Sequence, residues 1–120
     1  MDKTVRMALL FDFYGELLTE RQREFFGLYY NENLTLSEIA ENSGVSRQAV
    51  RDLVSKSEAA LEDIERKTNL LARFEQMNAD IDALTSCVKD ISRLNDNELN
   101  SEALSGLCEK MKVLIERMKQ

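Results

Sequence analysis

Residues 34–55 read LTLSEIAENSGVSRQAVRDLVS, and their pattern is the strongest indication of the fold. Thr35, followed three residues later by Glu38, forms a capping box, which predicts that a helix begins there. Gly44 adopts the left-handed backbone of a sharp turn at no steric cost, so the helix should end at this residue. Ser46 is a favourable N-cap for a second helix. Two short helices joined by a tight glycine turn at this spacing predict a helix-turn-helix.

The apolar positions of the stretch fit this motif. Three side chains are expected to face the core shared by the two helices: Ile39, Val50 and Leu53. Ala40 is small where the helices cross closely, and Val45 fills the angle between them. Ser43 departs from the usual pattern, in which the residue before the glycine is often apolar.

The outward side of the second helix carries the candidate DNA-binding residues, which are basic or polar: Ser46, Arg47, Gln48, Arg51, Ser55 and Lys56. In the major groove arginine pairs bidentately with guanine and glutamine with adenine. Lys56 is placed to reach a phosphate. Against the single Asp52, the three basic side chains give residues 46–56 a local charge of +2. The alternative interpretation is an ordinary solvated helix face.

Working outward, the preceding chain predicts two more helices. One covers roughly residues 3–18, and the next begins at Thr19, which forms a second capping box with Gln22. Seven of the eight aromatic residues lie within the first 30 residues, and only Phe74 lies beyond. Large rings build compact cores in small domains, so we expect core packing; base stacking is the alternative.

The chain after Ser46 predicts long amphipathic helices. An apolar seam at 4-3 spacing runs from Val50 to Leu71, which predicts a helix of about 25 residues or more. Residues 78–80 suggest a weak break. A further helix then starts at Ile81, and the polar residues 95–100 lead to a last one capped by Ser101.

The predicted fold class is therefore all-α, with two parts. Residues 1–57 form the helix-turn-helix module, and residues 58–120 form a helical extension for dimerisation or partner binding. The seam and the last amphipathic stripe offer more apolar surface than this slender half can bury alone, which favours a homodimer through the helices after Ser46. The alternative is an intramolecular antiparallel bundle.

Composition excludes several classes of function. The chain of 120 residues has no proline and no histidine, so imidazole-based metal sites and catalysis are excluded. With no nucleophile, phosphate loop or pocket indicated, we expect no enzyme, cofactor or metal. Cys87 and Cys108 are expected to be small buried hydrophobes. The acidic residues Glu62, Asp63 and Glu65 are interpreted as a solvated face.

The N-terminus lacks a signal-peptide pattern, and the longest apolar run, Met7 to Phe11, is too short for a membrane span. A cytoplasmic protein without a membrane partner is therefore expected. The net charge of −6 argues against general binding to nucleic acid. Any affinity for DNA must come from a local patch.

At these residues a resemblance to known families becomes visible. The segment LTERQREFFGLYYNENLTLSEIAENSGVSRQAV, residues 18–50, resembles region 4 of bacterial sigma factors. Together with the upstream MALLFDFYGELLTERQREFF and the long acidic helix that follows, it resembles more closely the YlxM family of small bacterial DNA-binding proteins. The resemblance covers roughly residues 1–75.

The resemblance implies an all-α, sigma-region-4-like helix-turn-helix without a wing. It places the family's DNA-contacting helix on Ser46 to Lys56, with Arg47, Gln48 and Arg51 as the contacts. It also implies a regulatory link to the signal recognition particle pathway of protein targeting.

Two functions follow as hypotheses. The first is a regulator of transcription that binds double-stranded DNA. The second is a protein-interaction adaptor of the signal recognition particle pathway, which contacts a component of the particle without binding DNA specifically. The local charge of +2 favours the first, and the net charge of −6 favours the second.

Overall fold

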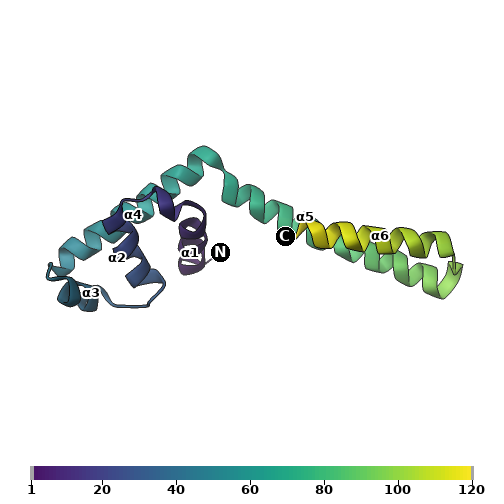
Figure 1. Cartoon of the computed structure of the whole chain (residues 1–120), viewed down its shortest axis with the longest axis horizontal. Helices are drawn as coiled ribbons and strands as arrows, with labels where there is room; N and C mark the ends of the chain where they lie inside the picture. Colours follow the sequence, from purple (N-terminus) through teal and green to yellow (C-terminus); the bar gives the residue numbers. More distant parts are fainter. Residues whose placement is uncertain (1, 120) are drawn as a thin grey trace. The chain divides into compact units, whose positions relative to one another are not determined.

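The computed structural model describes residues 2–119, which are helical over most of their length and contain no strand (Figure 1). This confirms the predicted all-α class. Six α-helices are joined by short connections, two of which are themselves a 3-10 turn and a π turn. In chain order the elements are α1 (Lys3–Tyr14), η1 (Gly15–Leu17), α2 (Glu20–Tyr30), α3 (Leu36–Ser43), α4 (Arg47–Thr68), α5 (Leu70–Leu94), η2 (Asn95–Leu99) and α6 (Glu102–Met118).

Side-chain caps fix the starts of α2 and α3 where the sequence predicts them. At α2 the Thr19 hydroxyl accepts from the Gln22 amide at 3.2 Å, and the Gln22 side chain accepts from the Thr19 amide at 3.0 Å. Thr35 and Glu38 make the same reciprocal pair at 3.1 and 3.2 Å. Both capping boxes are therefore confirmed.

The chain divides into two compact units, Met1–Leu71 and Ala72–Gln120. In the first unit, one core cluster joins α1, α2 and the second half of α4, with these members: Met7, Leu10, Tyr14, Leu18, Phe26, Leu61 and Leu71. Because Leu61 and Leu71 belong to this core, the first unit extends beyond residue 57, where the sequence-based division ends the module. Four of the eight aromatic rings belong to this cluster or pack against it, and Phe11 stacks on Phe26 with ring centroids 4.9 Å apart.

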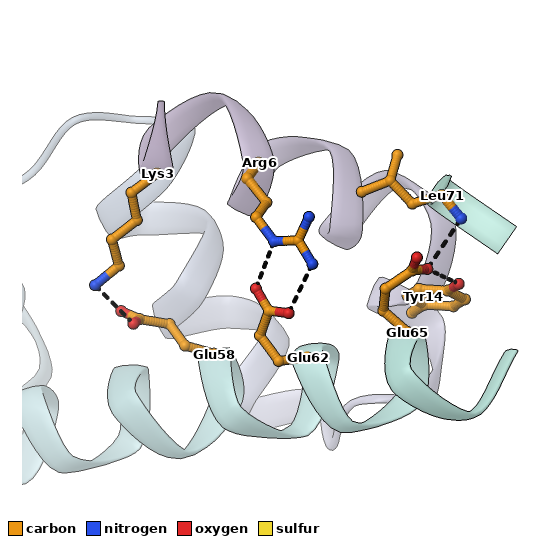
Figure 2. Close-up of polar contacts among 7 residues, drawn as sticks. All are labelled: Lys3, Arg6, Tyr14, Glu58, Glu62, Glu65 and Leu71. Carbon is orange, nitrogen blue, oxygen red and sulfur yellow. Dashed lines mark hydrogen bonds and ion pairs between the residues drawn. The ribbon is translucent and has the colours of Figure 1, made fainter. Parts of the chain in front are cut away.

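Three carboxylates of α4 hold α1 in place (Figure 2). Each carboxylate binds one side chain of α1. Lys3 Nζ lies 3.2 Å from Glu58, Arg6 donates twice to Glu62 at 2.7 and 2.8 Å, and the Tyr14 hydroxyl donates to Glu65 at 2.6 Å. Glu65 is only 6% exposed. The interpretation of these acidic residues as a solvated face is therefore wrong for Glu65, which is buried, and for Glu62, which binds Arg6 and is 34% exposed. It fits Asp63, which is 43% exposed and pairs with Arg66 and Lys67 of its own helix.

The long seam after Ser46 is divided earlier than the sequence predicts. Helix α4 ends at Thr68, and Asn69 adopts the left-handed conformation at φ 58°, which asparagine tolerates better than most residues. The same Glu65 oxygen that binds Tyr14 also accepts from the backbone amide of Leu71 at 2.9 Å, at the start of α5. The predicted break at 78–80 is wrong, because α5 continues through it to Leu94.

The second unit is a hairpin of α5 and α6 (Figure 1). Its core consists of Ile81, Val88, Cys108 and Ile115. The turn is organised by Asn95, whose buried amide donates to the Ser101 carbonyl at 2.9 Å and to the Ser105 hydroxyl at 3.0 Å, while its oxygen accepts from the Ser101 amide at 2.7 Å. Ser101 caps α6 as predicted.

Of the two cysteines, only Cys108 is buried as expected. Cys87 is exposed, because it lies about 100° around α5 from the buried Val88. No helix within residues 2–119 combines the length and the apolar character needed to cross a membrane.

Candidate nucleic-acid interface

The connection between α3 and α4 has the geometry that a helix-turn-helix requires. Gly44 takes φ 70° and ψ 25°, and its amide donates to the Ala40 carbonyl at 3.0 Å. The Val45 amide donates to the same carbonyl at 3.3 Å. The hydroxyl of Ser46 then accepts from the Ala49 amide at 3.0 Å and begins α4. Only two residues separate the end of α3 from this cap, which makes the turn tight.

A second core cluster fixes α4 against α2 and α3. Its buried members are Phe25, Ile39, Ala40, Val50 and Val54. Val45 and Leu53 are half-buried and pack against this cluster, so the predicted inward set is confirmed with Val54 added. With its inner side held from two directions, α4 has a defined outer side.

All six predicted contact residues are exposed: Ser46, Arg47, Gln48, Arg51, Ser55 and Lys56. Arg47 and Arg51 are four residues apart and therefore lie on one stripe of the helix. Neither arginine makes a hydrogen bond or an ion pair with another residue of the described chain, 2–119. Their guanidinium groups are therefore available to an external acceptor.

Two of the six side chains already have partners inside the motif. The Ser46 hydroxyl is occupied as the helix cap, although its hydrogen is still free to donate. The Gln48 amide donates to the Asp52 carboxylate at 2.9 Å, one turn further along α4. This pair is an i,i+4 contact that helical spacing alone would have revealed. Gln48 must share or exchange this bond before its amide can pair with a base.

The charge of the motif is balanced rather than basic. Over residues 35–56 the basic side chains are Arg47, Arg51 and Lys56, and the acidic ones are Glu38, Glu41 and Asp52. The three acidic groups therefore cancel the three basic ones. The positive charge is confined to the outer side of α4, since Glu38 and Glu41 belong to α3.

A hollow of about 510 Å³ lies beside Arg47 in the first unit. Its walls come from the starts of α1, α3 and α4, the end of α2 and the 31–35 connection: Lys3, Thr4, Tyr29, Tyr30, Asn33, Leu34, Thr35, Leu36 and Arg47. Lys3 and Arg47 give it two basic side chains. The sequence analysis did not find this feature, because no local pattern links Lys3 to residues 29–47.

One of the two tyrosines that line this hollow, Tyr30, is bonded to α4. The Tyr30 hydroxyl donates to Glu58 at 2.9 Å, and burial together with this carboxylate raises the pKa of the Tyr30 phenol. Glu58 also pairs with Lys3. Within residues 2–119 no cluster of three or more cysteine, aspartate or glutamate side chains is arranged to hold a metal ion.

Comparison with known proteins identifies close relatives of this chain. Residues 1–105 match the model of the UPF0122 family, described as "Putative helix-turn-helix protein, YlxM / p13 like". A UPF0122 protein from Halalkalibacterium halodurans is 45% identical over 114 residues, which cover 95% of this chain and 98% of the relative. UPF0122 proteins from Bacillus cereus and Bacillus anthracis are 43% identical over 96 residues, covering 80% of this chain and 87% of each relative.

Proposed function

Because the chain belongs to the YlxM- and p13-like family of helix-turn-helix proteins, we propose that it is a bacterial DNA-binding regulator. In this proposal the first turns of α4 lie in the major groove. The observation that carries the proposal is the pair Arg47 and Arg51. Both are exposed on one stripe, at the start of a helix that a tight turn and a buried core hold in a fixed orientation.

The spacing of the two arginines suits direct reading of bases. Four residues of α-helix rise about 6 Å, which is close to two base-pair steps of about 3.4 Å each. Arg47 and Arg51 can therefore each donate bidentately to a guanine about two steps apart. Gln48 lies beside this pair on α4 and can contribute to base contacts once its amide shares or exchanges the bond to Asp52.

Contacts to phosphate are expected from fewer groups. Lys56 and the hydroxyls of Ser46 and Ser55 lie on the exposed side of α4, where the backbone of the duplex would pass. Lys3, beside Arg47 at the hollow, is a further candidate. With only about three cations to neutralise phosphates, affinity for random DNA should be weak and should fall about 40-fold between 50 and 200 mM salt.

An adaptor function in the signal recognition particle pathway is the second candidate. The net charge of −6 and the balanced charge of residues 35–56 favour it, because neither provides a broad basic field for a polyanion. In that case α3 and α4 serve as a scaffold for a protein or RNA component of the particle. The two candidates differ in whether any duplex is bound specifically.

An electrophoretic shift assay separates them. A duplex selected from a random pool and the RNA of the signal recognition particle are titrated side by side with the parent and with an Arg47→Ala, Arg51→Ala double variant. We expect the double variant to lose at least tenfold in affinity for the selected duplex, since each bidentate contact contributes about 1–3 kcal/mol.

The matched control is Arg23→Ala, Arg93→Ala, which removes the same charge from exposed positions on α2 and α5. Its affinity should stay within about threefold of the parent. Equal binding by the parent and the Arg47, Arg51 double variant refutes the reading of DNA by α4. Binding to the particle's RNA alone supports the adaptor.

A further inference from the structure

The hairpin of the second unit buries only half of its apolar seam. On α5, Ile81, Val88 and Asn95 are buried at intervals of seven residues. The residues that lie four positions before each of these form a second column along α5, and they are exposed: Met77 at 56%, Leu84 at 44% and Ile91 at 38%. On α6, Leu107 and Leu114 are 55% and 42% exposed, although the residues directly after them, Cys108 and Ile115, are buried.

These two exposed columns lie on the same face of the hairpin. On each helix the exposed column is rotated from the buried column in the same sense, backward along the chain. The rotation is about 50° on α5 and about 100° on α6. The turn at Asn95 makes the helices antiparallel, and in an antiparallel pair the same sense of rotation places both columns on one side. We call this surface the hairpin face: Met77, Leu84, Ile91, Leu107 and Leu114.

We propose that the hairpin face binds the hairpin face of a second copy of this chain, so that two hairpins form one four-helix bundle. Cores of such bundles use both columns of every helix seam, whereas the isolated hairpin covers one. A second copy presents an identical pattern of apolar side chains and completes the other column. Helix α4 has no part in this interface, because its apolar side is buried in the first unit.

Charges at the edges of the face select one arrangement of the two hairpins. Asp80 lies at the edge formed by α5, and Lys110 and Arg117 lie at the edge formed by α6. The bonds of Asn95 to Ser101 fix the turn, and Asp80 lies 15 residues before Asn95 while Arg117 lies 16 residues after Ser101, so the two side chains lie at similar heights on opposite edges. A two-fold axis along the bundle packs α5 of one copy on α6 of the other, which brings Asp80 against Arg117 of the second copy.

The competing arrangement is disfavoured by the same charges. A two-fold axis across the bundle packs α6 on α6, and it places Lys110 and Arg117 of one copy against the same basic pair of the other. We therefore assign the first arrangement, in which both α5 helices enter the bundle from the same end.

The available area approaches that of a specific protein–protein interface. The 17 residues of α6 span about 25 Å, and two helices side by side are about 20 Å wide. The footprint is therefore about 500 Å² in projection, and protruding side chains bring its accessible area toward the roughly 800 Å² per partner of typical specific interfaces.

Sedimentation equilibrium without DNA tests the proposal, so its result does not depend on the proposed function. At tens of micromolar the parent should have about twice the monomer mass of 13.8 kDa. Leu84→Glu with Leu114→Glu should give monomers that keep the parent's far-ultraviolet helical signal. The matched control, Ala83→Glu with Ser86→Glu, adds the same charge to exposed α5 positions outside the hairpin face and should remain dimeric.

A charge exchange tests the arrangement even if the double glutamate variant fails to fold. Arg117→Glu should raise the dimer dissociation constant about tenfold, and adding Asp80→Lys should return it to within about threefold of the parent. A parent that sediments only as 13.8 kDa particles overturns the proposal. Tighter association of Arg117→Glu overturns the assigned arrangement, because it indicates α6 packed on α6.

Discussion

Replacing Gly44 tests whether the turn between α3 and α4 is held by backbone conformation alone. A Cβ atom added at this residue would meet nothing within 4 Å, so no steric clash with neighbours contributes. The φ of 70° remains, and it disfavours a non-glycine residue by about 1–2 kcal/mol. The gain of about 0.4–1 kcal/mol from a less flexible unfolded chain offsets part of this. We therefore expect Gly44→Ala to lower the free energy of unfolding by about 1 kcal/mol.

A series at this residue sharpens the expectation. Gly44→Val should be more damaging than Gly44→Ala, because a β-branched side chain resists the left-handed region further. Gly44→Asn should be milder, since asparagine tolerates this conformation. Gly27, within α2, is the matched control in the same unit. Its φ is not positive and an added Cβ would touch only the Asn31 amide at 4.0 Å, so Gly27→Ala should stabilise the protein by about 0.5–1 kcal/mol.

Tyrosine fluorescence during urea unfolding is the appropriate readout. All three tyrosines lie in the first unit, and the chain has no tryptophan, so the signal reports that unit alone. The two glycine substitutions should shift the midpoint in opposite directions. The conformational argument fails if Gly44→Ala is as stable as the parent, or if the valine variant is no worse than the alanine variant.

Three further predictions concern charge. The bidentate bond from Arg6 lowers the pKa of Glu62 in the folded protein. The ionised carboxylate therefore stabilises the fold at a pH above its unfolded pKa, and this stability is lost as the pH falls through its folded pKa. In urea unfolding from pH 6 to pH 3, the stability difference between the parent and Glu62→Gln should therefore shrink as the pH falls. Burial and the nearby glutamates raise the pKa of Tyr14 and Tyr30, so their contribution is complete below pH 10 and declines as the pH rises above it. A Tyr30→Phe variant should therefore lose less stability than the parent between pH 9 and pH 11. Asp52→Asn keeps an oxygen acceptor for Gln48 and removes one negative charge from the outer side of α4, so it should strengthen binding to the selected duplex about twofold in the shift assay; weaker binding would contradict the proposed contact with DNA.

Local signals predicted the helix-turn-helix well. The two capping boxes, Gly44 and the cap at Ser46 each depend on residues within four positions of one another, so the sequence alone is sufficient to recognise them. The six candidate contact residues follow from the same local register, because once Val50 and Val54 face inward the opposite side of α4 must face outward.

The errors concern contacts between distant residues. Glu62 and Glu65 find their partners 56 and 51 residues away, and no spacing rule connects Arg6 or Tyr14 to them. Asn69 ends α4, whereas Asn78 lies inside α5, although both are asparagines beside apolar helical sequence. What distinguishes them is the Glu65 carboxylate, which accepts from Leu71 just after Asn69 and depends on the packing of α1.

The three acidic contacts of α4 also restrict how this gene segment can change in length. Glu58, Glu62 and Glu65 are spaced by four and three residues, so they face α1 together only in one rotational register. A deletion of one codon between Ser46 and Glu58 would rotate all three away from α1 by about 100°, and α1 would lose Lys3, Arg6 and Tyr14 as anchors in a single event. An insertion of seven codons completes nearly two turns and restores the rotation, but it moves all three carboxylates about 10 Å along the helix axis, beyond the reach of their partners on α1. Descendants of this sequence should therefore vary here by substitution rather than by length.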